Sequence, residues 1–216
     1  MSTLPKPCFC LVTDRRRLVP DARTLSVEIA RIERQADEAL QAGIDMIQVR
    51  ERDLDARVLR DLTVRLVSLA AGRALILVND RADVALAAGA AGVHLRADGP
   101  AVLRVRTLGP DGWVIGRSIH TPAEAAEHAG ADYLLFGTVQ PTASKPAGHR
   151  VAGIAGLEAA VRSAAGTPVL AIGGLTPRES AACREAGAAG VAATGAFLGP
   201  SRAAAVREFR DGWITR

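Results

Sequence analysis

Two arginines and a glutamine lie at or just after the end of the second of several short apolar segments, and their chemistry suits a phosphorylated ligand. Gln48 and Arg50 alternate along the chain, so their side chains point to the same side, and Arg52 follows closely. Arginine binds phosphate oxygens through two parallel N–H groups, so an arginine pair at a strand end suggests a phosphate site. The alternative is that these arginines form salt bridges with Glu51 or Asp53. We favour phosphate binding.

The longest segment without a helix or strand pattern, residues 137–148, has similar chemistry. It contains the hydroxyl groups of Thr142 and Ser144 and the ammonium group of Lys145, which can all donate hydrogen bonds to phosphate oxygens. Lys145 stands out because Lys6 is the only other lysine in the chain. The glycines and prolines of this segment fit a lid that closes over a ligand, and the alternative is an ordinary solvated loop.

Two glycine-containing turns near the C-terminus suggest a second phosphate site. Gly173 and Gly174 separate an apolar segment from Thr176, which can cap a following helix. Ala193 and Thr194 end the next apolar segment and lead into another glycine turn. Backbone N–H groups at such turns bind anions. The alternative is that the glycines only allow tight turns between strands and helices.

Two aspartates follow the third and fourth apolar segments. Asp80 comes directly after Asn79, and Asp98 lies shortly after the fourth segment. Carboxylates at such positions can hold a Mg²⁺ ion that is bound to a diphosphate. Each aspartate could instead cap the helix that follows, and for Asp98 we favour the cap.

A serine and two histidines lie on or directly after the fourth and fifth apolar segments. His94 lies within its segment, where a hydrogen-bonded core histidine is the favoured interpretation. Ser118 and His120 alternate, which would allow a hydrogen bond between them. No aspartate partner and no Gly-x-Ser-x-Gly motif accompany them in the sequence, so we do not expect a hydrolase triad. Thr121 and Glu124 form a capping box that predicts the start of a helix.

Eight short apolar segments alternate with helical patterns along the chain. The predicted strands are Phe9–Thr13, Asp45–Val49, Leu75–Val78, Gly92–Leu95, Val114–Ser118, Tyr133–Phe136, Val169–Ile172 and Gly190–Ala193. In a chain of 216 residues this alternation predicts an α/β fold with one compact (β/α)8 TIM barrel, residues 1–216, whose first seven residues form a flexible tail. A doubly wound open sheet is the alternative, but its phosphate loop follows the first strand, where this chain has no glycine. In the barrel, the two C-terminal glycine turns follow strands seven and eight, a frequent place for phosphate.

Composition excludes several classes of protein. Aromatic residues make up 3% of the chain, and its net charge of +4 is dispersed apart from Arg15–Arg17, so we expect no nucleic-acid partner and interpret that triplet as a charged loop. No segment suits a membrane helix, and no signal-peptide pattern is present. Three cysteines fit a reducing cytosol better than a disulfide framework, so we expect a cytoplasmic protein in which Cys8 and Cys10 serve packing.

The ordered set of segments resembles the thiamine phosphate synthase and TenI superfamily, over nearly the whole chain. The matching segments are Gln48–Arg52, Val78–Arg81, Gly92–Leu95, Gly116–His120, Thr142–Lys145 and Ala171–Gly174. The resemblance implies a (β/α)8 barrel. Synthase members join a hydroxymethylpyrimidine diphosphate to a thiazole phosphate and release diphosphate with Mg²⁺, so the implied partners are these two small molecules. A homodimer also fits the resemblance.

The resemblance also assigns roles to residues. Arg50, Asn79, Ser144 and Lys145 would hold the diphosphate, Gln48 and Ser118 would face the pyrimidine, Asp80 would hold Mg²⁺, and Gly173, Gly174, Ala193 and Thr194 would hold the thiazole phosphate. Loss of diphosphate needs cations and donors around the leaving group more than a strong base. We therefore expect catalytic roles for Arg50, Arg52, Ser118 and Lys145, substrate contacts from His120 and Thr142, and a second Mg²⁺ carboxylate from Asp98.

Some residues depart from the family pattern. Synthases have Gly-Gln-x-Asp after the fourth strand, whereas this chain has Arg96–Gly99, so the second metal carboxylate falls on Gly99 unless Asp98 replaces it. The TenI tautomerase has a histidine where this chain has Thr138, and synthases have lysine where it has Arg52. Our leading hypothesis is a transferase that makes thiamine phosphate. The alternatives are a TenI-like enzyme that aromatises a thiazole phosphate carboxylate, and a regulatory protein that binds a phosphorylated ligand without catalysis.

Overall fold

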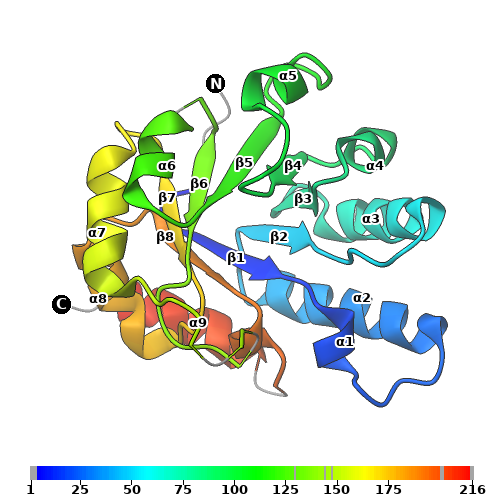
Figure 1. Cartoon of the computed structure of the whole chain (residues 1–216). Helices are drawn as coiled ribbons and strands as arrows, with labels where there is room; N and C mark the ends of the chain where they lie inside the picture. Colours follow the sequence, from blue (N-terminus) through cyan, green and yellow to red (C-terminus); the bar gives the residue numbers. More distant parts are fainter. Residues whose placement is uncertain (1–3, 129, 144, 147, 200–201, 215–216) are drawn as a thin grey trace.

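Eight parallel strands close into a barrel in the computed structural model, which describes residues 4–128, 130–143, 145–146, 148–199 and 202–214 (Figure 1). The strands are β1 (Cys8–Val12), β2 (Met46–Val49), β3 (Leu75–Asn79), β4 (Gly92–Leu95), β5 (Val114–Ile119), β6 (Tyr133–Phe136), β7 (Val169–Ile172) and β8 (Gly190–Ala193). Each strand pairs with the next, and β8 pairs with β1, so the sheet closes on itself. The predicted (β/α)8 barrel is confirmed.

Helices follow the strands and surround the barrel. They are α1 (Arg15–Leu18), α2 (Leu25–Gln41), α3 (Ala56–Ala70), α4 (Ala82–Ala87), α5 (Val102–Arg106), α6 (Pro122–Glu127), α7 (Gly153–Ser163), α8 (Ser180–Glu185) and α9 (Arg202–Ile214), with 3₁₀ helices η1 (Pro177–Glu179) and η2 (Gly195–Phe197). None of the described helices combines the length and apolar character needed to cross a bilayer.

The sequence predicts the bounds of all eight strands closely, but it does not predict the first helix. Every observed strand end lies within one residue of its prediction, because parallel strands buried on both faces appear as short, nearly continuous apolar runs. The interpretation of Arg15–Arg17 as a charged loop is wrong, since these residues form the helical turn α1. The carboxylate of Asp14 caps that turn by accepting a hydrogen bond from Arg17 N at 3.2 Å.

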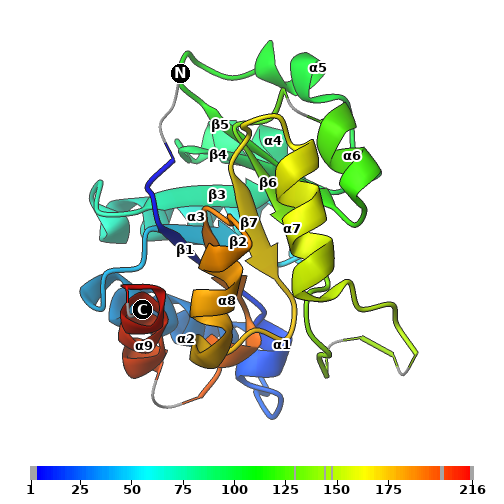
Figure 2. The ribbon, with the colours of Figure 1, turned by 90° about the vertical axis from the view of Figure 1, so that its left-hand side faces the viewer.

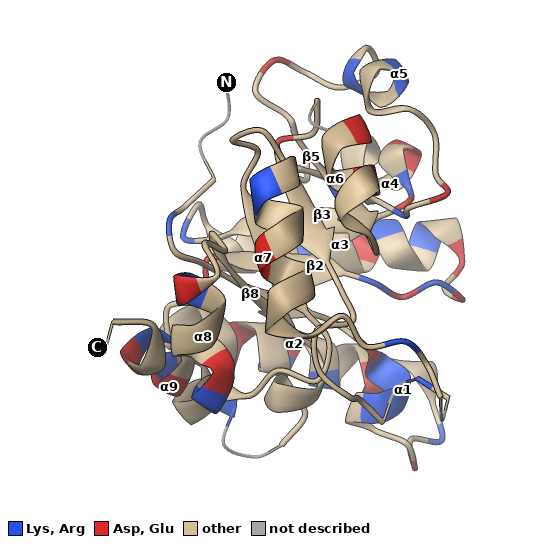
Figure 3. Cartoon of the chain, turned by 60° about the vertical axis from the view of Figure 1, so that its left-hand side comes forward, with Lys and Arg blue, Asp and Glu red and all other residues tan. Residues whose placement is uncertain are grey.

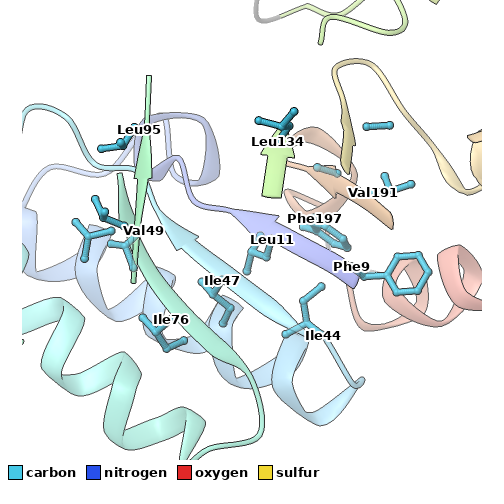
Figure 4. Close-up of a cluster of buried hydrophobic side chains, with 14 of the residues drawn as sticks. Phe9, Leu11, Ile44, Ile47, Val49, Ile76, Leu95, Leu134, Val191 and Phe197 are labelled. Carbon is cyan, nitrogen blue, oxygen red and sulfur yellow. The ribbon is translucent and has the colours of Figure 1, made fainter. Parts of the chain in front are cut away.

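Side chains alternate along each strand between two cores. Phe9 and Leu11 point outward and pack with the helices, as Figure 4 shows. Cys8 and Cys10 point inward, and burial raises the pKa of Cys10 to about 12, which keeps its thiol protonated and inert. The prediction that these cysteines serve packing is confirmed. Leu4, in the segment expected to be a tail, is also buried in the inner core.

All eight strands run in the same direction, so their carboxyl ends meet at one end of the barrel. The arrow of β1 points toward α1 in Figure 1, and that of β7 points toward the same side in Figure 2. The long loop after β6 lies on this side as well. The polar residues that follow the strands therefore lie around one opening.

Candidate active site

A cavity of about 810 Å³ lies at the carboxyl end of the barrel, and all eight strand ends contribute to it. Most predicted site residues line it: Gln48, Arg50, Arg52, Asn79, Asp98, Ser118, His120, Thr142, Lys145, Gly173, Gly174, Ala193 and Thr194. Asp80 does not line the cavity, but it forms an ion pair with Arg96, which does. Ser144 lies outside the described residues. The tertiary structure thus brings residues from distant parts of the chain to one opening.

Positive charge dominates the cavity wall. Its lining includes Arg17, Arg50, Arg52, Arg96 and Lys145, against two carboxylates among the described lining residues. Figure 3 shows the basic residues of α1 as a continuous blue stretch. Cationic side chains lining one cavity favour an anionic ligand such as a phosphate ester.

Sequence reasoning did not select Arg17 or Arg96 as site residues. Arg17 follows the first strand on the turn that Asp14 caps, and Arg96 directly follows β4. Both arginines could have been found from their place in the segment that follows a predicted barrel strand, where site residues lie. The basic triplet masked it for Arg17, because three adjacent arginines resemble a solvated loop.

Arg50 is available to a ligand because another arginine binds the nearby acids. Arg15 is buried, and its guanidinium pairs with Glu28 at 2.8 Å, Glu51 at 3.1 Å and Asp53 at 2.5 Å. Arg50 is half-buried and forms no ion pair with any residue that the structure describes. The alternative in which the two site arginines pair with Glu51 or Asp53 is therefore wrong.

The electrostatic surroundings of Arg50 favour the binding of an anion beside it. Burial of its guanidinium, together with the nearby charge of Arg52, lowers the pKa of Arg50 from its ordinary value. Its main-chain N–H donates a hydrogen bond to Thr13 Oγ1 at 3.0 Å, which fixes the backbone from which the side chain projects. A partly desolvated cation without a partner gains when an anion binds beside it.

A buried chain of hydrogen bonds ends at Ser118. His94 contacts Tyr133 Oη through Nδ1 and Ser118 Oγ through Nε2, both at 2.8 Å. Gly116 leaves room for the phenol, since a Cβ there would lie 2.2 Å from the Tyr133 ring. Ser118 therefore bonds to His94, as expected for a core histidine, and not to His120.

His120 has a different partner. Its Nδ1 contacts the carbonyl oxygen of Gly137 at 2.6 Å. A carbonyl oxygen only accepts, so Nδ1 donates the proton and a neutral ring has its second nitrogen, Nε2, as an acceptor. His120 also lines the cavity, where it can accept a hydrogen bond from a substrate.

We expect His94 to make stability depend on pH. Burial, with the charges of Arg117 and Arg50, lowers the pKa of His94 to about 3, whereas an unfolded histidine titrates near 6.5. Below pH 6.5 the unfolded state thus binds one more proton, and the free energy of unfolding falls by up to about 1.4 kcal/mol per pH unit as pH decreases toward 3. Urea unfolding of the wild type and His94→Gln between pH 4.5 and 7.5 measures this, and equal slopes for the two proteins would contradict it.

The glycine turn after β7 approaches neighbouring chain segments too closely for any side chain. A Cβ at Gly173 would lie 2.6 Å from Thr138 Cγ2, and one at Gly174 would lie 2.2 Å from the carbonyl oxygen of Pro141. Both glycines also have positive φ values, 104° and 64°. Because these two residues have no side chains, the main chain of the turn itself lines the cavity. The predicted helix start follows as η1, where the Glu179 carboxylate accepts from Thr176 N at 2.7 Å.

The two predicted metal carboxylates share one arginine. Asp80 and Asp98 lie 2.8 Å and 3.4 Å from Arg96 Nε. The favoured interpretation of Asp98 as a helix cap is wrong, because α5 begins only at Val102, beyond its reach, and its N-cap is Ala101. Asp80 does not cap α4 either, since Arg81 is the N-cap there.

The chain is similar to a known protein family over most of its length. The family model described as thiamine monophosphate synthase matches residues 17–197. The chain belongs to this family. The matched range includes every predicted cavity residue, from Gln48 to Thr194. The match thus covers the site as well as most of the barrel.

Individual relatives of the thiamine monophosphate synthase family agree. The thiamine-phosphate synthase of Anaeromyxobacter dehalogenans is 45% identical over 177 residues, which cover 79% of each chain. That of Moorella thermoacetica is 41% identical and covers 80% of this chain and 84% of its own length. The solved thiamine phosphate pyrophosphorylase from Pyrococcus furiosus superposes with a TM-score of 0.79 at 30% identity, covering 96% of this chain and 95% of that one. The chain is a transferase of thiamine biosynthesis.

Proposed function

We propose that this transferase joins a hydroxymethylpyrimidine diphosphate to a thiazole phosphate and releases thiamine phosphate and diphosphate. The observation that carries the proposal is the uneven distribution of charge in the cavity. Cationic side chains follow β1, β2, β4 and β6, whereas neutral glycine turns follow β7 and β8. One cavity with both features suits a diphosphate on the first side and a phosphate monoester on the other.

The cationic side stabilises the leaving group. As the C–O bond to the pyrimidylmethyl carbon breaks, negative charge grows on the departing diphosphate, and Arg50, Arg52 and Lys145 would neutralise it. The amide of Asn79 and the hydroxyl of Thr142 line the same cavity and would add hydrogen bonds to the phosphate oxygens. Ser144 is proposed as a further donor from sequence alone.

The floor of the cavity would bind the pyrimidine. Gln48 is buried, and its Nε2 has no hydrogen-bond partner among the described residues. A buried amide without a partner is unfavourable, so a ring nitrogen of the substrate that accepts from Nε2 would relieve it. Ser118, held by His94, supplies a second polar contact.

The glycine turns would position the nucleophile. N–H groups near Gly173, Gly174 and Thr194 would bind the phosphate of the thiazole, which places the ring nitrogen beside the pyrimidylmethyl carbon. The nitrogen lone pair forms the new C–N bond, and the positive charge remains on the thiazolium ring. The step transfers no proton, so it needs no general base.

The two expected Mg²⁺ ligands are arranged around a guanidinium. Asp80 and Asp98 both contact the guanidinium of Arg96, so the space between the carboxylates already contains a cationic group. Octahedral Mg²⁺ needs free oxygens on its ligands. As arranged, this pair fits a guanidinium and does not fit Mg²⁺, and we assign the ion no step.

Product formation from the two substrates tests the function. We expect thiamine phosphate when the enzyme is mixed with hydroxymethylpyrimidine diphosphate and thiazole phosphate, measured both with Mg²⁺ and with EDTA. Absence of product in both conditions, from a folded protein that binds thiazole phosphate, would contradict the synthase and favour the TenI-like alternative. Aromatisation of a thiazole phosphate carboxylate would then separate that enzyme from a non-catalytic regulator.

The Lys145→Ala variant is expected to lower kcat/KM for coupling by about tenfold to a hundredfold, since a charge-assisted hydrogen bond contributes about 1.5–3 kcal/mol. The residue is exposed in the loop after β6, so thermal unfolding should not change. Lys6→Ala is the matched control, because it removes the only other lysine, which lies outside the cavity. Equal loss in both variants, or none in Lys145→Ala, would exclude the assigned role.

The proposal also covers the cellular compartment and the oligomeric state. A reducing, cytoplasmic setting suits the three free cysteines, which are all buried. A homodimer is the oligomeric state that the family resemblance favours, and sedimentation velocity would measure it.

A further inference from the structure

Arg96 is held in place at both its main chain and its side chain. Its N–H donates to Asp80 Oδ1 at 2.9 Å, and its Nε lies 2.8 Å from Oδ2 of the same carboxylate. Asp98 Oδ1 approaches the same Nε at 3.4 Å. The guanidinium approaches each carboxylate through Nε, and neither of its terminal nitrogens donates a hydrogen bond to a residue that the structure describes. Both terminal nitrogens thus remain to donate hydrogen bonds to a ligand.

A buried arginine fixes the turn that contains Arg96. Arg117 is 2% exposed and donates to the carbonyl oxygens of Arg96 at 2.6 Å and Pro100 at 3.0 Å. Gly99 N also donates to the Arg96 carbonyl, at 3.0 Å. The backbone of the turn is therefore fixed before a ligand binds, and a preorganised cation stabilises developing charge without further rearrangement.

The turn also leaves little room for another carboxylate. A Cβ at Gly99 would lie 3.1 Å from the carbonyl oxygen of Arg96 and 3.2 Å from Arg117 Nη1, both closer than ordinary contact. Asp98 is largely exposed and already faces Arg96. The local structure therefore favours a guanidinium at this position over an additional acidic ligand.

From these contacts we infer that Arg96 takes the place of a divalent cation and binds the diphosphate directly, so that diphosphate binding by this enzyme does not require Mg²⁺. The inference rests on the proposed function. Asp80 and Asp98 act as positioning residues that orient the guanidinium toward the cavity, where Arg50 and Arg52 also lie. A guanidinium supplies a full positive charge and a planar pair of donors that match phosphate oxygens.

Calorimetric titration with inorganic diphosphate tests the inference. In EDTA the wild type should bind diphosphate, and Mg²⁺ should change the affinity by less than about threefold. Arg96→Ala should weaken binding in EDTA by about tenfold to a hundredfold, the range for one charge-assisted contact. Arg96→Lys should fall between, because it keeps the charge and loses the planar pair of donors. Arg104→Ala, an exposed arginine on α5, is the matched control and should bind as the wild type does.

A metal titration provides a readout that does not depend on diphosphate. The wild type should not bind Mn²⁺, followed by the loss of the free-ion paramagnetic resonance signal, whereas Arg96→Ala frees both carboxylates and should bind it. Diphosphate binding by the wild type that needs Mg²⁺, or unchanged binding by Arg96→Ala in EDTA, would overturn the inference.

The coupling assay distinguishes failure of the inference from failure of the proposed function. Product formation by an enzyme that binds diphosphate only with Mg²⁺ would refute the inference alone. Diphosphate binding in EDTA without product formation would refute the proposed function alone. Absence of diphosphate binding both in EDTA and with Mg²⁺ would refute both.

Discussion

Replacing Arg50 with alanine is expected to lower kcat/KM for thiamine phosphate formation by about a hundredfold to a thousandfold, the range found when one preorganised donor to developing charge is removed. Arg50 is half-buried and lacks an ion-pair partner in the described part of the chain, so a bound diphosphate would gain the full interaction. Steady-state kinetics with both substrates measures the loss.

The same variant separates function from folding. Burial lowers the pKa of Arg50, which means that the folded state holds this charge less favourably than water does. The free energy of unfolding of Arg50→Ala should therefore be unchanged or higher, although its activity is lost. Arg50→Lys should recover only part of the activity, because a point charge does not reproduce bidentate binding. Arg57→Ala, an exposed residue on α3, controls for the removal of an arginine. Loss of stability together with activity would argue that Arg50 has a structural role.

Arg15→Ala is expected to lower the free energy of unfolding by about 3–5 kcal/mol, the range for removing one partner of a buried ion pair. Glu28 and Glu51 are 6% and 4% exposed, and both pair with Arg15. Without the guanidinium, two buried carboxylates would have lost their main counter-charge. Equilibrium unfolding in urea at pH 7 measures the change.

Two further variants show whether burial causes this effect. Arg16 pairs with Glu28 and Asp53 as well, but its side chain is 67% exposed, so Arg16→Ala should change stability by less than about 1 kcal/mol. Adding Glu28→Gln and Glu51→Gln to Arg15→Ala should restore part of the stability, because it removes the uncompensated charges. Equal effects of Arg15→Ala and Arg16→Ala would contradict this explanation.

The Arg15 cluster also connects stability to the site. Glu51 and Asp53 each directly follow a site arginine in the sequence, and the buried Arg15 binds both acids. Removing it would free two carboxylates to compete with diphosphate for Arg50. We therefore expect Arg15→Ala to weaken diphosphate binding in addition to lowering stability.

The sequence determined the barrel and most of the cavity wall. Parallel strands buried on both faces give short apolar runs, and the residues that follow such runs must meet at one end of a closed barrel. For that reason the sequence alone predicts that several polar and glycine residues share one site. The structure brings them into one cavity, as it does for Gln48, Arg50, Ser118 and Gly173.

Only the tertiary structure decided which polar groups pair. Arg15, Glu51 and Asp53 were individually visible in the sequence, but salt bridges form between side chains 36 or more residues apart, according to distances that no local pattern encodes. The same holds for Ser118, which bonds to His94 on a neighbouring strand and not to His120 two residues away. Arg96 is the clearest case. The sequence showed that Arg96–Gly99 differs from the metal-binding pattern of synthases, but only the three-dimensional contacts showed that the Arg96 guanidinium lies against both Asp80 and Asp98. Periodicity fixes the direction of a side chain, whereas its partner depends on how distant strands pack against one another.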